Sequence, residues 1–197
     1  MKTAHLVRLF LGVFFVCLAL TAHAQTFVFT TFMTGPNESP PNASNATGSA
    51  TVTLDITLHT LRIEFNWTGL SGNASIAHIH GATAQPFTGT ASPATNASGF
   101  PGLPATTSGS YDMTFNTGDN ATWNDAYRNG PGGGTALGAE SAFLQDTQDG
   151  QMYFNVHSTA FPGGEIRGFL VPEPGTVALI TIGGVGLLLA ARRARRS

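Results

Sequence analysis

The strongest constraint on the fold is a strict alternation of apolar and polar residues over positions 52–67. The apolar members occupy every second position in two runs: Val52, Leu54, Ile56, then Leu61, Ile63, Phe65 and Trp67. A period of two residues is that of a β-strand with one buried face. Because the two runs meet around His59 and Thr60, the segment is predicted to form a β-hairpin.

Further strands are predicted at 27–32, 75–80, 110–116, 151–157 and 165–171. The proline-containing stretch 82–108 has no lasting period and is predicted to be surface loop. One or two short helices are expected around 123–127 and 139–144. Only 10% of the residues are charged, beside 24 glycines and 11 prolines, which disfavours long amphipathic helices. The predicted fold class is all-β: an antiparallel β-sandwich or open, Greek-key-like barrel, flanked by N-terminal and C-terminal hydrophobic helices.

Residues 1–24 have the order of a secretory signal peptide. Lys2 and Arg8 precede an apolar run at 9–20, and Ala22 and Ala24 give the small-x-small exit that signal peptidase cuts. Cleavage is predicted after Ala24. A retained anchor helix is the alternative, but the run is shorter than the roughly 20 residues that span a bilayer. The single cysteine, Cys17, would leave with this peptide, so no disulfide is expected.

The C-terminal residues 172–197 combine three features in a fixed order. A Pro-Glu-Pro motif precedes an apolar stretch at about 176–191, and four arginines follow: the motif is Pro172, Glu173 and Pro174, and the arginines are Arg192, Arg193, Arg195 and Arg196. The arginines would hold a transmembrane helix with its basic end in the cytoplasm. The arrangement resembles the PEP-CTERM sorting signal of exported bacterial proteins, which implies processing by an exosortase. An ordinary single-span anchor is the alternative.

The charge and the motifs of residues 25–171, the predicted β domain, exclude several classes of function. This region carries three arginines and ten acidic residues, so nucleic acid is not an expected partner. The chain has no Gly-x-Ser-x-Gly elbow, no His-Glu-x-x-His helix and no Walker loop. We therefore expect a protein that is not an enzyme and needs no cofactor.

One pattern nevertheless suggests a metal site. His78 and His80 lie two residues apart on a predicted strand, so both imidazoles project from the same face, and His157 ends another predicted strand. Three histidines suit zinc or copper; the alternative is that they only satisfy hydrogen bonds from neighbouring loops. Glu165 and Arg167 are predicted to share a face, where they either orient the imidazoles or close the sheet edge.

Several segments together resemble the CHRD domain, over nearly all of residues 27–170. The matching residues are 35–41 (GPNESPP), 47–50 (TGSA), 67–70 (WTGL), 77–81 (AHIHG), 155–157 (NVH) and 162–168 (PGGEIRG). The resemblance implies a non-enzymatic extracellular binding or structural domain. With the terminal signals, it predicts a bacterial protein exported through the inner membrane to the cell surface, the outer membrane or the extracellular matrix.

Two hypotheses follow for its partner. In the first, the domain engages an extracellular polymer or another surface protein. In the second, His78, His80 and His157 bind zinc or copper. The His-x-His strand is similar to that of copper/zinc superoxide dismutases, although a dismutase would need further ligands.

Overall fold

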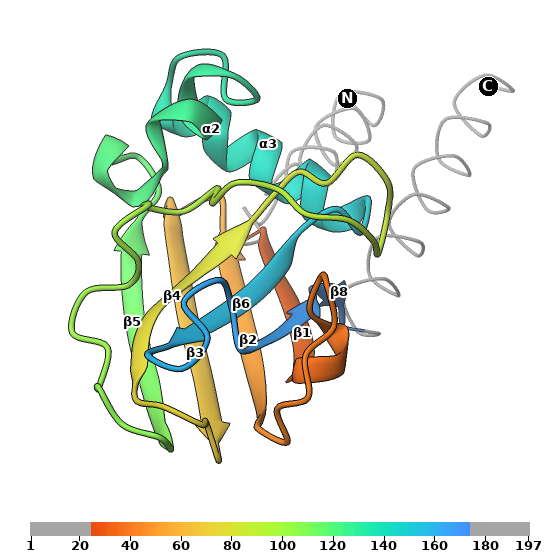
Figure 1. Ribbon diagram of the computed structural model, residues 1–197. Helices are drawn as coiled ribbons and strands as arrows, with labels where there is room; N and C mark the ends of the chain where they lie inside the picture. Colours follow the sequence, from red (N-terminus) through yellow and green to blue (C-terminus); the bar gives the residue numbers. More distant parts are fainter. Residues whose placement is uncertain (1–24, 174–197) are drawn as a thin grey trace, which may run out of the picture.

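A computed structural model describes residues 25–173 of the chain (Figure 1). Within them, eight strands and two α-helices are joined by loops and two short 3-10 turns. The strands are β1 (Thr26–Thr34), β2 (Thr47–Asp55), β3 (Thr60–Thr68), β4 (Ala74–His80), β5 (Gly109–Asn116), β6 (Tyr153–Ser158), β7 (Ile166–Phe169) and β8 (Val171–Pro172). The helices are α2 (Asp125–Asn129) and α3 (Ala136–Gln148), and the 3-10 turns are η1 (Gly35–Asn37) and η2 (Asn120–Thr122).

All eight strands belong to one antiparallel sheet in the order β4-β6-β7-β1-β2-β3-β5, and β8 pairs with β1 beside β7. The sheet curls, so β4, β6 and β7 cross in front of β1, β2, β3 and β5 (Figure 1). No pairing joins β4 to β5 in residues 25–173, which leaves a half-barrel. The predicted antiparallel β class with short helices is confirmed, but the layers are two halves of one sheet and not two sheets.

The predicted hairpin is confirmed as β2 and β3. Val52 pairs with Ile63 and Leu54 with Leu61, and all four side chains are completely buried. The turn has no glycine. Instead, Asp55 Oδ1 accepts hydrogen bonds from the backbone N–H groups of two turn residues, each at 2.9 Å, and His59 takes the left-handed conformation at φ 53°. The turn is therefore held by an aspartate side chain, a common turn residue, and not by a glycine.

The core lies between the two halves of the sheet. Phe65 on β3 and Phe154 on β6 have ring centres 4.8 Å apart, and Phe100 lies within 6.2 Å of both. Phe100 comes from the stretch predicted as surface loop, and Ala94 from the same stretch is also buried. Their N–H groups donate to backbone carbonyls of β4, so part of the stretch covers that edge of the sheet. The surface-loop prediction is therefore wrong for this part.

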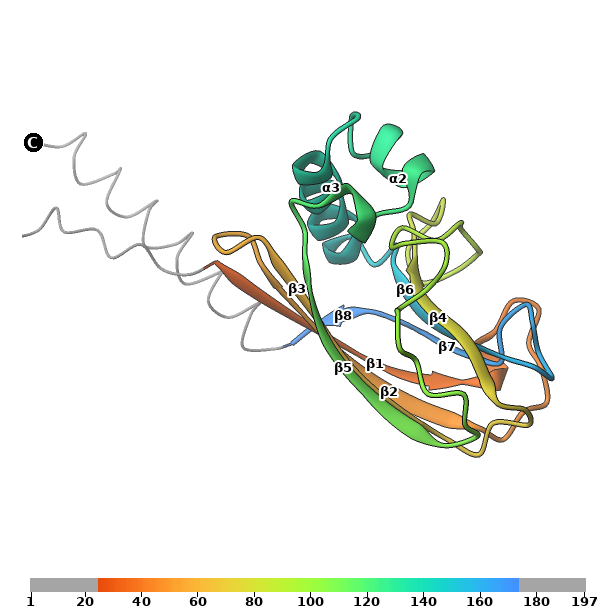
Figure 2. The ribbon, with the colours of Figure 1, turned by 90° about the vertical axis from the view of Figure 1, so that its left-hand side faces the viewer.

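Both predicted helices are present and cover one end of the half-barrel (Figure 2). Asn124 caps α2 by accepting from a backbone N–H, and Thr135 caps α3 in the same way. Phe143 of α3 is completely buried, with its ring 5.6 Å from that of Trp123. The helices thereby close the apolar core at this end.

The terminal predictions concern residues outside the described range. The signal peptide at 1–24 and the apolar helix at about 176–191 both stay predictions. Between residues 25 and 173, no helix has the length and apolar character needed to cross a membrane.

Candidate metal centre

The pairing of β4 with β6 brings the three predicted histidines together. His78 lies opposite Asn155, and His157 lies opposite Ile76, so His78, His80 and His157 project from one face of the two strands. The intervening residues of both strands point to the opposite face and fill the core. The His-x-His spacing therefore places imidazoles outside the core, on the convex side of the sheet.

Two loops bury this histidine cluster. The exposed fractions of His78, His80 and His157 are 5%, 9% and 8%. The loop after β4 brings the Ala91 carbonyl to 2.8 Å from His80 Nδ1, and the turn after β6 brings the Pro162 carbonyl to 2.8 Å from His157 Nδ1. A carbonyl oxygen only accepts, so both Nδ1 atoms carry the proton, and the two Nε2 atoms keep a lone pair.

The His80 lone pair accepts a hydrogen bond from His78 Nδ1–H, and the His157 ring lies close to both. His80 Nε2 lies 2.9 Å from His78 Nδ1, and candidate ligand atoms of the three rings all lie within 4.8 Å of one another. A tetrahedral zinc ion with Zn–N bonds of 2.0–2.1 Å separates its ligands by about 3.3 Å, so small ring movements would fit one ion. His157 Nε2 is buried and has no hydrogen-bond partner in residues 25–173.

The environment keeps the imidazoles neutral at pH 7. Burial, together with the neighbouring His80 and His157, lowers the pKa of His78 to about 3. Burial also lowers the pKa of His80 to about 4, although the hydrogen bond to Ala91 works in the opposite direction. The pKa of His157 is lowered by burial and raised in part by Pro162. Neutral imidazole is the form that ligates a metal.

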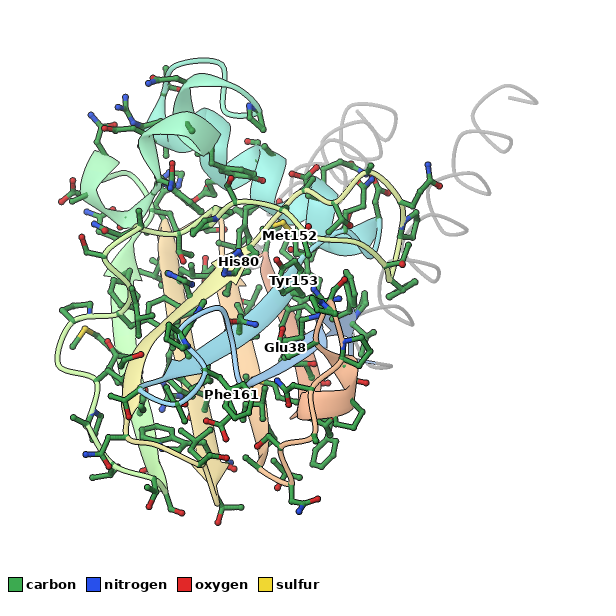
Figure 3. The ribbon with its side chains drawn as sticks, in the orientation of Figure 1. Glu38, His80, Met152, Tyr153 and Phe161 are labelled. Carbon is green, nitrogen blue, oxygen red and sulfur yellow. The ribbon has the colours of Figure 1, made fainter. Side chains whose placement is uncertain are left out.

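A second layer of side chains extends from the cluster. The Tyr153 ring stacks on His80 with centres 4.8 Å apart and planes 9° from parallel, and the guanidinium carbon of Arg167 lies 4.6 Å from the centre of the same ring. On its other side Arg167 faces Glu38, and its Nε lies 3.9 Å from Glu38 Oε2. Figure 3 shows Tyr153 between His80 and Glu38.

The predicted shared face of Glu165 and Arg167 is wrong. Glu165 lies in the bend before β7, where the regular alternation has not begun, and its carboxylate accepts from Ser44 Oγ and the Ser71 N–H, both at 2.7 Å, and from Ser158 Oγ. Arg167 donates instead to backbone carbonyls and faces Glu38. Neither side chain bonds a histidine of the cluster directly.

Sequence reasoning missed three residues of this layer: Glu38, Tyr153 and Asn155. Tyr153 and Asn155 lie four and two residues before His157 on one strand, a spacing that signals a shared face. Glu38 gives no such signal, because Asn155 Nδ2 reaches its Oε1 across 117 positions of sequence, at 2.7 Å. Burial raises the pKa of Glu38 to about 7, opposed by Arg167 and the hydrogen bond from Asn155.

The fold and site define a β half-barrel domain with a covered cluster of histidines on its convex face. The chain belongs to the CHRD domain family, which matches residues 29–170. A PEP-CTERM protein-sorting motif matches residues 170–196 and implies export across the inner membrane and processing by exosortase-type machinery. Comparisons with curated proteins and with solved structures found no match.

Proposed function

We propose that the CHRD domain of this exported protein is a non-enzymatic domain that binds one zinc or copper ion through His78, His80 and His157. The observation that carries the proposal is His157 Nε2, a buried lone pair without a partner in residues 25–173 beside two further imidazoles. A buried polar atom left unpaired costs about 1–3 kcal/mol. Coordination of a cation would satisfy this atom, and the same ion would replace the hydrogen bond that joins His80 Nε2 and His78 Nδ1.

The three nitrogen donors favour a metal ion that is intermediate between hard and soft. Three neutral imidazole nitrogens suit zinc and copper, whereas calcium and magnesium prefer oxygen. A tetrahedral ion held by three histidines keeps a fourth position for water or another small ligand. Each histidine is less than 10% exposed, and two loops cover the cluster, which leaves little room for a substrate. This burial supports a storage or structural role over catalysis.

Metal analysis of the purified full chain tests the proposal. The protein is equilibrated with Zn²⁺ or Cu²⁺ at pH 7, desalted and measured by inductively coupled plasma mass spectrometry. We expect about one ion per chain, and loss of most of it in the His157→Ala variant. His59→Ala is the matched control, because His59 lies in the β2–β3 turn and bonds Glu140 instead.

Two results would overturn the metal assignment. One is a wild-type protein that retains well under half an equivalent of either ion. The other is a His157→Ala variant that retains as much as the His59→Ala control. Because truncation of the buried His157 side chain leaves a cavity, a His157→Gln variant, which keeps a polar side chain of similar volume without an imidazole, is measured beside it and is expected to lose the ion as well.

A further inference from the structure

A second candidate site lies beside the metal centre, where β7 and β8 meet β1 in the middle of the sheet. A pocket of about 520 Å³ opens there between η1 and the loop that follows β4. Its floor contains Glu38 and Arg167, and its walls contain Phe32, Phe87 and Phe169. Figure 3 shows Glu38 below Tyr153, next to the ribbon of η1. None of the predicted metal ligands lines this pocket.

The floor presents a donor and an acceptor side by side. Glu38 and Arg167 are only 8% and 5% exposed, and Glu38 Oε2 lies 3.9 Å from Arg167 Nε, which is too far for a direct hydrogen bond. Asn155 engages Glu38 Oε1, while backbone carbonyls of Asn37 and Gly89 engage Nε and Nη1 of Arg167. These hydrogen bonds fix both groups and leave Glu38 Oε2 and Arg167 Nη2 to bind a further molecule.

The walls are aromatic and open to solvent. Phe32 is 62% exposed and Phe87 is 58% exposed, which is unusual for side chains of this size. Phe87 also adopts φ 57°, in the left-handed region that bulky residues avoid. Its ring packs edge to face on that of Phe169, with centres 5.9 Å apart. Backbone strain that keeps an apolar ring in water is typical of a ligand contact.

The chemistry of floor and walls selects a class of ligand. On a sugar ring, one hydroxyl can donate to the carboxylate while its neighbour accepts from the guanidinium, since every hydroxyl does both. The C–H face of the ring then packs on an exposed phenylalanine. An anionic ligand fits poorly, because a carboxyl group lies beside the guanidinium and residues 25–173 hold three arginines against eleven acidic side chains.

We propose that this pocket binds one neutral sugar unit of an extracellular polysaccharide. The pocket and the metal centre are neighbours through Arg167, Tyr153 and His80, but the sugar contacts need no ion. Binding is therefore measured on the full chain after treatment with a chelator. The outcome is then independent of whether the histidines hold a metal.

The probes are defined hexasaccharides of glucose, mannose and galactose, with hexagalacturonate as the acidic comparison, and binding is followed by isothermal titration calorimetry. We expect at least one neutral hexasaccharide to bind with a dissociation constant below about 1 mM. Glu38→Gln and Phe87→Ala should each weaken it at least tenfold. Leu58→Ala is the matched control, because Leu58 is 70% exposed in the β2–β3 turn, away from the pocket, and its loss should change nothing.

Three results would overturn the proposal: no neutral hexasaccharide binds, hexagalacturonate binds more tightly, or Phe87→Ala binds as well as the wild type. Phe87 is a solvent-exposed side chain, so its variant is expected to fold. Urea unfolding of the Glu38→Gln protein checks that lost binding reflects the carboxylate and not a lost fold.

Discussion

Glu165 is predicted to stabilise the domain by accepting hydrogen bonds, and not by pairing with a basic side chain. It is completely buried, and its carboxylate accepts hydrogen bonds from three separate segments: Ser44 Oγ and the Ser71 N–H in two loops, and Ser158 Oγ at the end of β6. Burial alone would raise its pKa, but these hydrogen bonds outweigh burial and lower the pKa below its ordinary value of 4.5. The ionised form is therefore the stable one in the folded protein.

The size of this stabilisation can be worked out from what happens to the three hydrogen-bond donors when the carboxylate is removed. In Glu165→Ala all three lose their acceptor; the serine hydroxyls can rotate, whereas the Ser71 N–H is fixed. With about 1.5–3 kcal/mol for a hydrogen bond to a charged group, we expect a loss of about 3–5 kcal/mol in the free energy of unfolding. Glu165→Gln keeps an oxygen for Ser44 and Ser71 and should lose only about 1–2 kcal/mol.

Urea unfolding followed by tryptophan fluorescence measures both losses, because Trp67 and Trp123 are each 2% exposed in the folded state. With a slope of about 2 kcal/mol per molar urea, the Glu165→Ala midpoint should fall by roughly 2 M. A shift below about 0.3 M, or equal shifts in both variants, would refute the reasoning. The advantage of wild type over Glu165→Gln is present above pH 4.5 and is lost as the pH falls through the lowered pKa.

Three further predictions concern the histidine cluster, Gly81 next to it in the chain, and the sorting motif. In chelator-treated protein, the free energy of unfolding should fall from pH 6.5 toward pH 4, because His78 stays neutral in the folded protein while the unfolded chain takes up protons. Unfolding curves measured across this pH range should show a slope that is about 1.4 kcal/mol per pH unit smaller in His78→Gln than in the wild type. Gly81→Ala places a Cβ against Met152 Sδ in the packed core, and calorimetry should show about 1–3 kcal/mol of destabilisation. Mass spectrometry of the mature protein should find a C-terminus near Pro172–Pro174; an intact arginine tail would contradict exosortase processing.

The hairpin was predictable because both of its determinants are local. The period-2 pattern of Val52 to Trp67 specifies which face is buried, and the turn held by Asp55 completes the register. The shared face of His78 and His80 follows from the same rule. Such predictions need only neighbouring residues, so a single sequence is sufficient for them.

Long-range contacts were not predictable in the same way. His157 joins the cluster only because β6 pairs with β4 in one particular register, and Glu38 reaches Asn155 only because the chain turns at η1. Glu165 was assigned to the regular part of a strand, whereas it lies in the bend that precedes β7. No periodicity encodes these placements, since each depends on how distant segments meet.

The short strand β8 has a mechanical consequence. Val171 and Pro172 pair with Thr30 and Phe29, and the Glu173 N–H donates to the Val28 carbonyl at 3.0 Å. Pro172 of the sorting motif is thus part of the sheet, and Glu173 is joined to it by a backbone hydrogen bond. A pull on the chain beyond Glu173 would load these few hydrogen bonds next to residue 28, close to the other end of the described chain. Before any cleavage near Pro174, tension on the C-terminal segment would therefore reach the domain at this end of β1, and η1, at the other end of β1, would face away from the load.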